Sequence, residues 1–170
     1  GMSGTEDEKR YYKAFLDKYK DIAKWHEELQ STAIQYKKIK TPSGREYAFP
    51  YAQRMAWGGS SYSTQIKNYP VQGFATADIV PIACINVYNL MKQGKTKSLM
   101  VNTVHDSIVI DVHPNEIDIM TNILDEGTKN VITSLHSYYK VDFNIPLDTE
   151  IKCGSNWLNM EVVEINKKSI

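Results

Sequence analysis

The sequence predicts an α+β fold in which antiparallel strands are backed by long helices. Two segments, residues 12–33 and 74–91, place apolar side chains at three- and four-residue steps, the spacing of an amphipathic helix. Residues 101–112 instead carry β-branched residues on both sides of an adjacent His105 and Asp106, which predicts a hairpin. Hydrophobic residues make up 42% of the 170 residues, enough to cover the core of one domain without disulfides.

The first forty residues are expected to form a helix, with the acidic residues 6–8 at its positive end. Residues 36–49 are polar and contain a turn at residues 41–44, Thr-Pro-Ser-Gly, after which residues 45–50 complete a short hairpin. Residues 58–61, Gly-Gly-Ser-Ser, are expected to be a flexible joint.

A second helix is predicted from near Gln72 to about Gln93, and Pro81 must bend it or lie within its first turns. After the hairpin of residues 101–112, residues 113–116, His-Pro-Asn-Glu, are typical of a helix start. A third helix is predicted through residues 117–135, and the alternation of residues 143–152 predicts a final strand.

The cysteines and the N-terminus exclude several classes of protein. Cys84 and Cys153 lie in unrelated contexts without paired ligand spacing, so neither a disulfide framework nor a zinc site is indicated. The N-terminus carries no apolar signal core, and no run approaches the roughly 18 apolar residues of a membrane span. We therefore expect a soluble protein of a reducing intracellular compartment, with no membrane partner.

Charge is balanced overall but not along the chain. The 20 basic and 20 acidic residues cancel, which counts against a free-standing protein that binds nucleic acid through phosphate neutralisation. Residues 1–67 nevertheless carry twelve Lys or Arg against eight Asp or Glu. Any phosphate contact is therefore expected in the N-terminal part.

Four segments carry short ordered motifs. Residues 68–79 begin Asn-Tyr-Pro-Val-Gln-Gly, and residues 101–112 contain His-Asp at a hairpin. These two segments resemble the last two motifs of family A DNA polymerases, the class of bacterial DNA polymerase I and phage replicases. Residues 41–50 are similar to its Thr-x-x-Gly-Arg-x-x-x-x-Pro stretch, and residues 147–157 look like the end of phage polymerases. The resemblance covers roughly residues 9–158.

The resemblance implies a palm-like antiparallel sheet and a C-terminal palm segment. We expect a single domain over residues 1–170, with a residual fingers and P-helix region at residues 1–60 and the palm core at residues 61–158. By the same resemblance, Asp106 would be one of two carboxylates that hold a pair of Mg²⁺ ions, and His105 would contact the primer terminus. Asn68 and Gln72 would meet the minor-groove edge of the newest base pairs, and Arg45 would also contact DNA.

Two elements of the family pattern do not occur in the sequence. The other metal-binding Asp belongs to an Asp-Tyr-Ser-x-Ile-Glu strand, and a fingers helix carries Arg, Lys and Tyr; neither motif is found here. Ser107 stands where the family has Glu, and Thr64 where bacterial members have a DNA-contacting Arg. The expectation is therefore half of an active site, to which a second, N-terminal polymerase polypeptide adds the rest. Primer-template DNA and dNTP would be its ligands, in the cytoplasm of a bacterial or phage-infected cell.

Other interpretations of the same residues stay open. Asp106 could be a turn residue that accepts backbone N–H bonds, and Asn68 could be a helix N-cap. The run Lys37-Lys38-x-Lys40 is either a solvated surface or a weak DNA-binding candidate. The whole chain could be a non-catalytic palm remnant, or a module that binds DNA or a replication partner. A phosphohydrolase using His-Asp on a helix is excluded by the strand-like residues around the pair.

Overall fold

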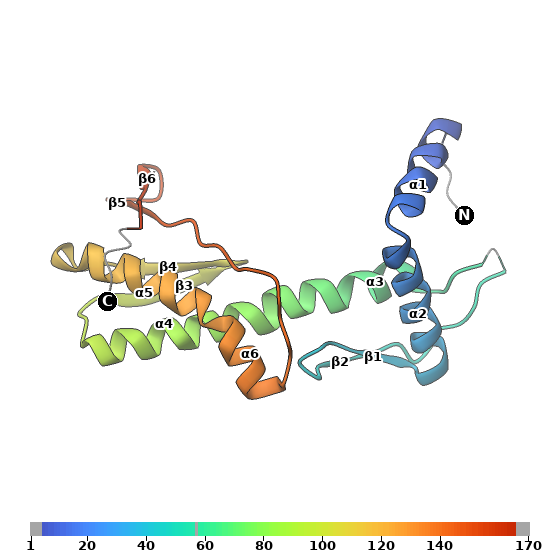
Figure 1. Cartoon of the computed structure of the whole chain (residues 1–170), viewed down its shortest axis with the longest axis horizontal. Helices are drawn as coiled ribbons and strands as arrows, with labels where there is room; N and C mark the ends of the chain where they lie inside the picture. Colours follow the sequence, from blue (N-terminus) through green and yellow to red (C-terminus); the bar gives the residue numbers. More distant parts are fainter. Residues whose placement is uncertain (1–4, 57, 166–170) are drawn as a thin grey trace. The chain divides into compact units, whose positions relative to one another are not determined.

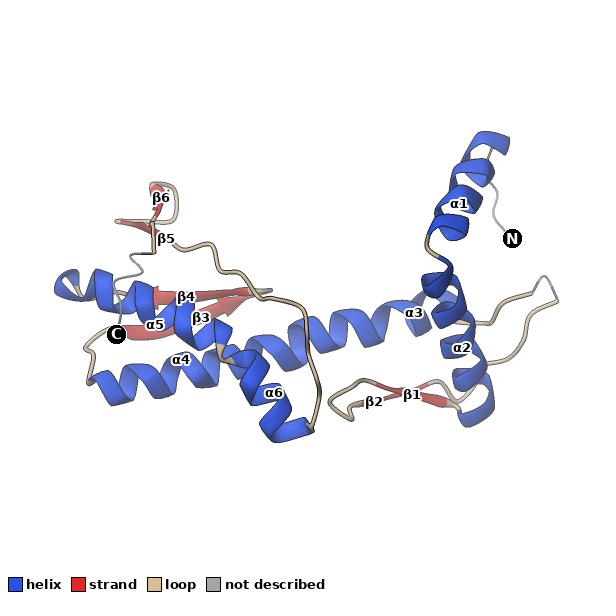
Figure 2. Ribbon diagram, viewed as in Figure 1, coloured by secondary structure: helices blue, strands red, loops and turns tan. Residues whose placement is uncertain are grey.

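The structure is a computed structural model that describes residues 5–56 and 58–165. It divides into two compact units, residues 1–74 and 75–170, each of which is described by itself. Helices and three two-stranded antiparallel sheets confirm the predicted α+β class (Figure 2). The boundary between the two units follows Phe74, whereas the boundary between the fingers and P-helix region and the palm core was expected after residue 60. Whether the chain folds as one domain stays a prediction.

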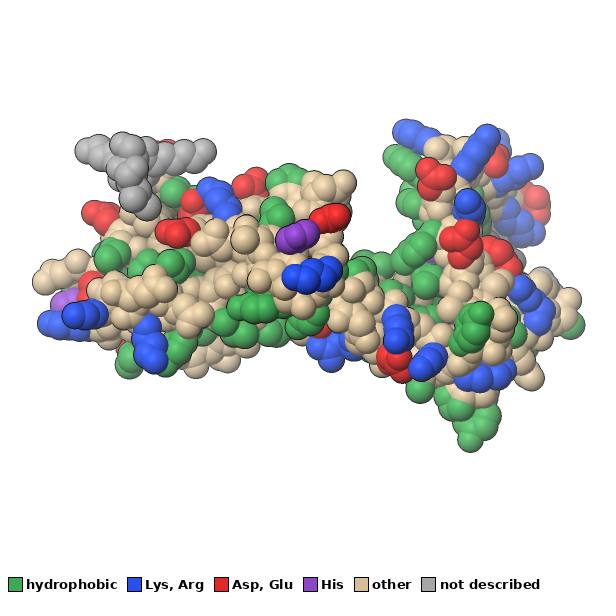
Figure 3. All heavy atoms as spheres, turned by 60° about the horizontal axis from the view of Figure 1, so that its bottom comes forward, with side chains coloured by type: hydrophobic (Ala, Val, Ile, Leu, Met, Phe, Trp, Pro, Cys, Tyr) green, Lys and Arg blue, Asp and Glu red, His purple; other side chains and the backbone are tan. Residues whose placement is uncertain are grey.

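The first unit contains the helices α1 (Glu6–Lys18), α2 (Lys20–Tyr36) and α3 (Ser63–Gln72), and the hairpin of β1 (Lys38–Lys40) and β2 (Glu46–Ala48). The helix expected over the first forty residues is therefore two helices, because Tyr19 leaves the helical conformation between them. The acidic first turn of α1 is confirmed, and Thr5 and Glu8 form a capping box there. Basic and acidic side chains are intermixed on the surface of this unit (Figure 3).

A small apolar core joins the elements of this first unit. Its buried residues come from α2, β1, the segment after β2, and α3: Ala33, Ile39, Phe49, Ala52 and Ile66. The loop before α3 is anchored to it rather than free. Ser60 is 1% exposed, and its backbone N–H and hydroxyl both donate to the side-chain oxygen of Gln30, over 3.1 and 3.0 Å. The flexible joint expected at residues 58–61 is therefore held at its third residue by a buried amide.

The second unit contains α4 (Val80–Gly94), β3 (Leu99–Val104), β4 (Ser107–Asp111), α5 (Ile117–Lys129), α6 (Val131–Tyr139), β5 (Lys152–Gly154) and β6 (Met160–Val162). A 3₁₀ turn, Pro114–Glu116, leads into α5 as residues 113–116 predicted. The final strand predicted over residues 143–152 is wrong in extent. Only residues 152–154 pair, with β6, because the preceding residues have no partner strand among the described residues.

Helices α4 and α5 pack against each other, and the β3–β4 hairpin packs on the core that they form (Figure 1). Val87 and Met91 of α4 and Met120 and Ile123 of α5 form the buried core there, against the inner face of the hairpin. The two helices approach closely at Gly127, where an added Cβ would lie 2.6 Å from Cγ2 of Val87. Glycine is required at this position because no side chain fits between the helices.

The helix predicted to begin near Gln72 begins nine residues earlier, at Ser63, and is continuous to Gly94. Its middle, Gly73–Ile79, is a π-helix between Pro70 and Pro81. Each proline lacks the N–H that an α-helical bond needs, and the wider π turn is one way to accommodate such gaps. By length and apolar composition alone, this 32-residue helix could cross a membrane. The sequence was expected to contain no apolar run of that kind. Of the most apolar stretch of the helix, 28% is buried.

Candidate functional site

His105 and Asp106 form the two-residue turn between β3 and β4, as the sequence predicted. Val104 pairs with Ser107 across the turn, and the Ser107 hydroxyl donates to the Val104 carbonyl over 2.8 Å. His105 takes the left-handed conformation, with φ of 55°, which is uncommon outside glycine and is enriched at functional sites. The turn is thus a short, hydrogen-bonded tip that presents its side chains to solvent.

The Asp106 side chain is exposed, and no hydrogen bond to its carboxylate is present in the part of the chain that the structure describes. The turn is stabilised by Ser107 instead. A turn aspartate would accept backbone N–H bonds, so the structural interpretation of Asp106 receives no support. An exposed carboxylate at a rigid tip is suited to binding a hard cation or a polar ligand.

One carboxylate does not make a complete metal site. Among residues 5–56 and 58–165, no group of three or more His, Cys, Asp or Glu could hold a metal ion. Asp111 belongs to the same hairpin but pairs with Leu99 at its far end, five residues from Asp106, or roughly 16 Å along an extended strand. Asp106 fits the chemistry of a Mg²⁺ ligand, but it belongs to no such group among the described residues.

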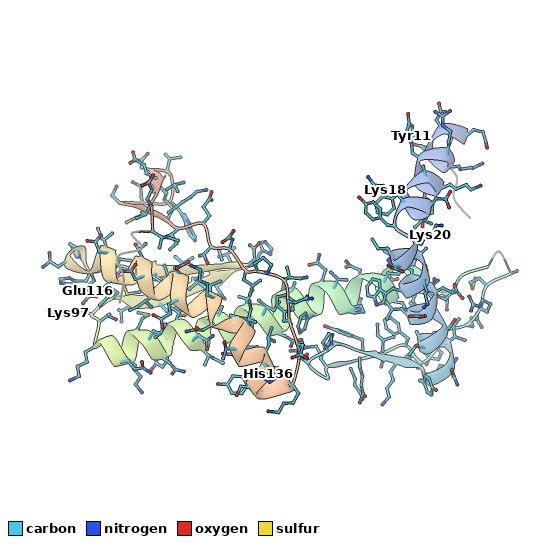
Figure 4. The ribbon with its side chains drawn as sticks, viewed as in Figure 1. Tyr11, Lys18, Lys20, Lys97, Glu116 and His136 are labelled. Atoms are coloured by element: carbon cyan, nitrogen blue, oxygen red, sulfur yellow. The ribbon has the colours of Figure 1, made fainter. Side chains whose placement is uncertain are left out.

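The far end of the hairpin is fixed by Glu116, which sequence reasoning missed. Its carboxylate accepts the backbone N–H groups of Lys97 and Ser98 over 2.9 Å each, and the Ser98 hydroxyl over 2.6 Å (Figure 4). The Ser98 hydroxyl, followed by the Lys97 N–H, lowers the pKa of Glu116 below its usual value. The N–H of His113 in turn donates to the Ser98 oxygen over 3.0 Å. The residues before β3 and after β4 are thereby held together.

Register and packing determine which face of the hairpin is exposed. Met100 pairs with Ile110 and Thr103 with Ile108, and Met100, Ile108 and Ile110 pack on the α4–α5 core. The register shifts between Met100 and Asn102, which leaves Val101 56% exposed as a bulged residue. One face of the hairpin is therefore anchored in the core, and the other is open.

Asn68 and Gln72 lie in α3, four residues apart, and both side chains are exposed. Asn68 is the sixth residue of the helix, so its interpretation as an N-cap is wrong. The opposite face of α3 is held in the first unit by the buried Ile66 and Pro70. The structure therefore presents both amides on one outward helix face, as a groove-contacting role needs, although the role itself stays a prediction.

Glycine at position 73 is explained by its neighbour on β2. A Cβ there would overlap the hydroxyl of Tyr47, whose ring also lies 5.4 Å from that of Tyr69. Phe49 contacts Tyr69 at a centroid distance of 5.9 Å. These contacts set the rotation of α3 about its axis, so the hairpin of residues 38–48 determines which way Asn68 points.

The basic residues near β1 and β2 are largely engaged in internal contacts. The Lys37 ammonium donates to the Ala52 carbonyl over 2.6 Å, and Lys38 and Lys40 form ion pairs of 2.9 and 2.8 Å with Glu46. Lys40, and after it Lys38, lowers the pKa of Glu46. The lysine run is thus a paired surface and a poor DNA-binding candidate. Arg45 is exposed at the end of the turn, and its backbone N–H donates to the Thr41 hydroxyl.

The remaining histidines and tryptophans do not join these residues. Burial, followed by the charge of Lys67, lowers the pKa of His26. His136 lies 3.0 Å from Asp142 at the end of α6, a surface pair (Figure 4). Trp25 is 37% exposed and Trp157 is 68% exposed, and the latter lines a cavity of about 360 Å³ beside β4 and α5; Trp57 lies outside the described residues. The described residues among these add no ligand at the His105–Asp106 turn.

Comparison with known proteins gives a consistent result. Residues 3–159 match the sequence profile of DNA polymerase family A. DNA polymerase I of Lactococcus lactis subsp. cremoris is 27% identical over 154 residues, which are 89% of this chain and 16% of that protein. The DNA polymerase of Bacillus phage SP01 is 23% identical over 162 residues, 92% of this chain and 17% of that protein.

A solved structure supports the same fold. The POL domain of Pol1 from M. smegmatis, in complex with DNA primer-template and dNTP, superposes with a TM-score of 0.67 at 23% identity. The match covers 75% of this chain and 23% of that chain. The chain thus spans less than a fifth of the length of the two curated relatives above.

Proposed function

Because the chain belongs to DNA polymerase family A, we propose that it is the C-terminal palm part of a template-directed DNA polymerase, which transfers nucleotides with two Mg²⁺ ions. Its ligands would be primer-template DNA and dNTP, inside a bacterial or phage-infected cell, and a phage-type enzyme is part of the proposal. The observation that carries it is the exposed Asp106 at the tip of a core-anchored hairpin.

Each residue named in the proposal has a separate task. Asp106 would supply one anionic ligand for Mg²⁺, which would provide activation of the primer hydroxyl and charge stabilisation for the leaving pyrophosphate. His105, beside it, contacts the primer terminus. Asn68 and Gln72 donate to the purine N3 and pyrimidine O2 acceptors that every correct base pair presents in the minor groove. Arg45 contacts the DNA backbone. Base-pair shape is then checked without dependence on sequence.

The proposal includes a second polymerase segment that carries the other Asp and the fingers helix. One carboxylate cannot position two ions, and neither motif occurs in these 170 residues. The aromatic side chains of α1 are consistent with a missing neighbour: Tyr11 is 68% exposed and Phe15 48% exposed, and no residue of the helix is buried. Such a face is the kind of surface that another polypeptide covers.

The test mixes this chain with a polypeptide bearing an Asp-Tyr-Ser strand and a fingers helix, and measures primer extension with Mg²⁺ and dNTP. We expect no extension by the chain alone and template-dependent extension by the mixture. Asp106→Asn removes the anionic ligand with little change of shape, so it should abolish extension while association persists. The matched control is Asp111→Asn, which removes an exposed carboxylate from the far end of the same hairpin. Equal extension by the Asp106→Asn and wild-type mixtures would contradict the metal-ligand role.

A non-catalytic module is the second candidate, and the single carboxylate at the turn is the observation that favours it. In that case the chain would bind DNA or a replication partner through the palm fold without taking part in nucleotide transfer. The same mixture distinguishes the two candidates. Binding of primer-template DNA without any extension, with several complementary polypeptides, would favour the module.

A further inference from the structure

The outward face of α3 carries a third side-chain amide. Gln65 is exposed, as are Asn68 and Gln72, whereas Ile66 and Pro70 on the opposite side are buried. Successive members of the set Gln65, Asn68 and Gln72 are three and four residues apart, which places them along one stripe of a helix. All three are side-chain amides, whereas Thr64 beside them has a short hydroxyl.

The spacing along the helix can be compared with that of a duplex. At a rise of about 1.5 Å per residue, Gln65 precedes Asn68 by about 4.5 Å, and Asn68 precedes Gln72 by about 6 Å. Base pairs follow one another at about 3.4 Å. Side chains of this length can adjust by an ångström or two, so each amide reaches a position one to two base pairs from its neighbour.

The orientation of this amide stripe is defined within the first unit. Tyr69 contacts Tyr47 and Phe49, and Tyr47 leaves no room for a side chain at position 73. This packing restricts rotation of α3 about its axis, and Gln65 and Asn68 turn together because they lie on one face of the same helix. Gln65 and Asn68 face the same ligand or none.

We propose that Gln65 is a third minor-groove donor, which extends the checking of base-pair shape by one to two base pairs beyond those contacted by Asn68. This inference rests on the proposed function, because it places duplex DNA against α3. The amide N–H of Gln65 would donate to a purine N3 or a pyrimidine O2, acceptors that all Watson–Crick pairs share. Gln65 is then a specificity-determining residue for pair geometry, and its effect is confined to one position along the duplex.

The experiment mixes the full chain with the polypeptide that bears the Asp-Tyr-Ser strand and the fingers helix, and measures binding to a fluorescent primer-template duplex by anisotropy, at fixed low salt. Single 3-deazaguanine substitutions, which remove one N3 acceptor, are placed at each of the last six base pairs in turn. The variant is Gln65→Met, which keeps the length and the helix propensity of the side chain and removes its donor. Gln35→Met, at an exposed glutamine of α2 in the same unit, is the matched control. Asn68→Leu and Gln72→Leu are the reference variants.

We expect Gln65→Met to weaken binding about fivefold, the effect of one lost hydrogen bond, and Gln35→Met to bind as the wild type does. The wild type should lose affinity with 3-deazaguanine at three positions. Gln65→Met should become insensitive at one of them only, one to two base pairs from the position at which Asn68→Leu becomes insensitive. Thermal midpoints of Gln65→Met and Gln35→Met should agree, since both sites are exposed.

The outcomes separate this inference from the proposed function. If Asn68→Leu and Gln72→Leu each lose sensitivity at one position while Gln65→Met behaves as the wild type, the role of Gln65 is refuted and the proposed function stands. If none of the three variants changes the binding of duplex DNA, or the mixture binds no duplex, both are refuted. A loss of sensitivity by Gln65→Met at every position would show a general defect in the helix and would also refute the inference.

Discussion

Replacing Gly127 by Ala should destabilise the second unit, although the same change stabilises most helices. The added Cβ would lie 2.6 Å from Cγ2 of Val87, 3.0 Å from its backbone nitrogen and 3.1 Å from its Cα. Overpacking of this kind costs about 1–3 kcal/mol, and two of the three contacts are with backbone atoms of α4 that cannot rotate away. The helix-propensity gain of Ala over Gly returns about 1 kcal/mol. The net expectation is a loss of up to about 2 kcal/mol in the free energy of unfolding.

Gly94 at the end of α4 provides the matched control, because an added Cβ there meets its nearest neighbour, Thr96, at an ordinary 3.6 Å. Gly94→Ala should be neutral or stabilising by up to about 1 kcal/mol. The two variants should therefore differ by about 1–3 kcal/mol, or roughly 2–12 °C in thermal midpoint for a chain of this size. Urea titrations followed by circular dichroism measure the free energies directly.

A double variant tests whether the backbone contacts decide the effect. Val87→Ala removes the closest methyl but leaves the backbone nitrogen 3.0 Å from the new Cβ, so it should rescue Gly127→Ala only in part. The coupling energy from the double-mutant cycle should be favourable and smaller than the loss caused by Gly127→Ala alone. A Gly127→Ala variant as stable as Gly94→Ala would refute the close approach of α4 and α5, and with it the placement of the core beneath the hairpin.

Three further variants test contacts that hold the candidate site in place. Glu116→Gln should lower the thermal midpoint at pH 7. Because the folded-state pKa of Glu116 is lowered, the stability that its carboxylate contributes is present above the unfolded pKa of about 4.3 and is lost as pH falls. A midpoint difference between variant and wild type that does not shrink between pH 5 and pH 3 would contradict the contact. Gly73→Ala should destabilise the first unit by about 1–3 kcal/mol, measured by urea titration, and Tyr47→Ala in the same chain should remove most of the added penalty. Gln30→Leu leaves the buried N–H and hydroxyl of Ser60 without their acceptor. It should lower the free energy of unfolding by about 1–3 kcal/mol and speed proteolysis between residues 53 and 62. Unchanged cleavage would mean that the loop is held by other contacts.

Sequence reasoning identified the hairpin at residues 101–112 and its turn because the signal is local. β-Branched residues favour strands, and a polar pair between two such runs favours a tight turn, whatever the rest of the chain does. The start of α1 was recognised for the same reason, since acidic residues at a helix N-terminus act within one turn. The resemblance to family A polymerases depends on short ordered motifs, and the match over residues 3–159 confirms the family.

The extent of the long helix was beyond sequence patterns. Pro70 and Pro81 both indicate a break, yet the chain continues as a helix from Ser63 to Gly94 through a π-helical middle. Packing of the helix on Tyr47 and on the cores of the two units outweighs the free-energy cost of two prolines in a helix. Local helix propensities cannot predict such packing. The strand expected over residues 143–152 failed for the opposite reason. Alternation predicts a strand, but a strand also needs a partner, and no described segment pairs with most of it.

By itself, the sequence determined the fold class, the family and the chemistry available at His105, Asp106, Asn68 and Gln72, since these depend on residue types and short spacings. Only the tertiary structure decided which side chains are exposed and what holds them. In the structure, the Ser107 hydroxyl stabilises the turn, and the Asp106 carboxylate is exposed. Glu116 holds the far end of the hairpin, and Gln65 lies on the same stripe of α3 as Asn68. The physical reason is that burial and hydrogen-bond partners arise between residues far apart in the chain, where spacing along the sequence has no influence.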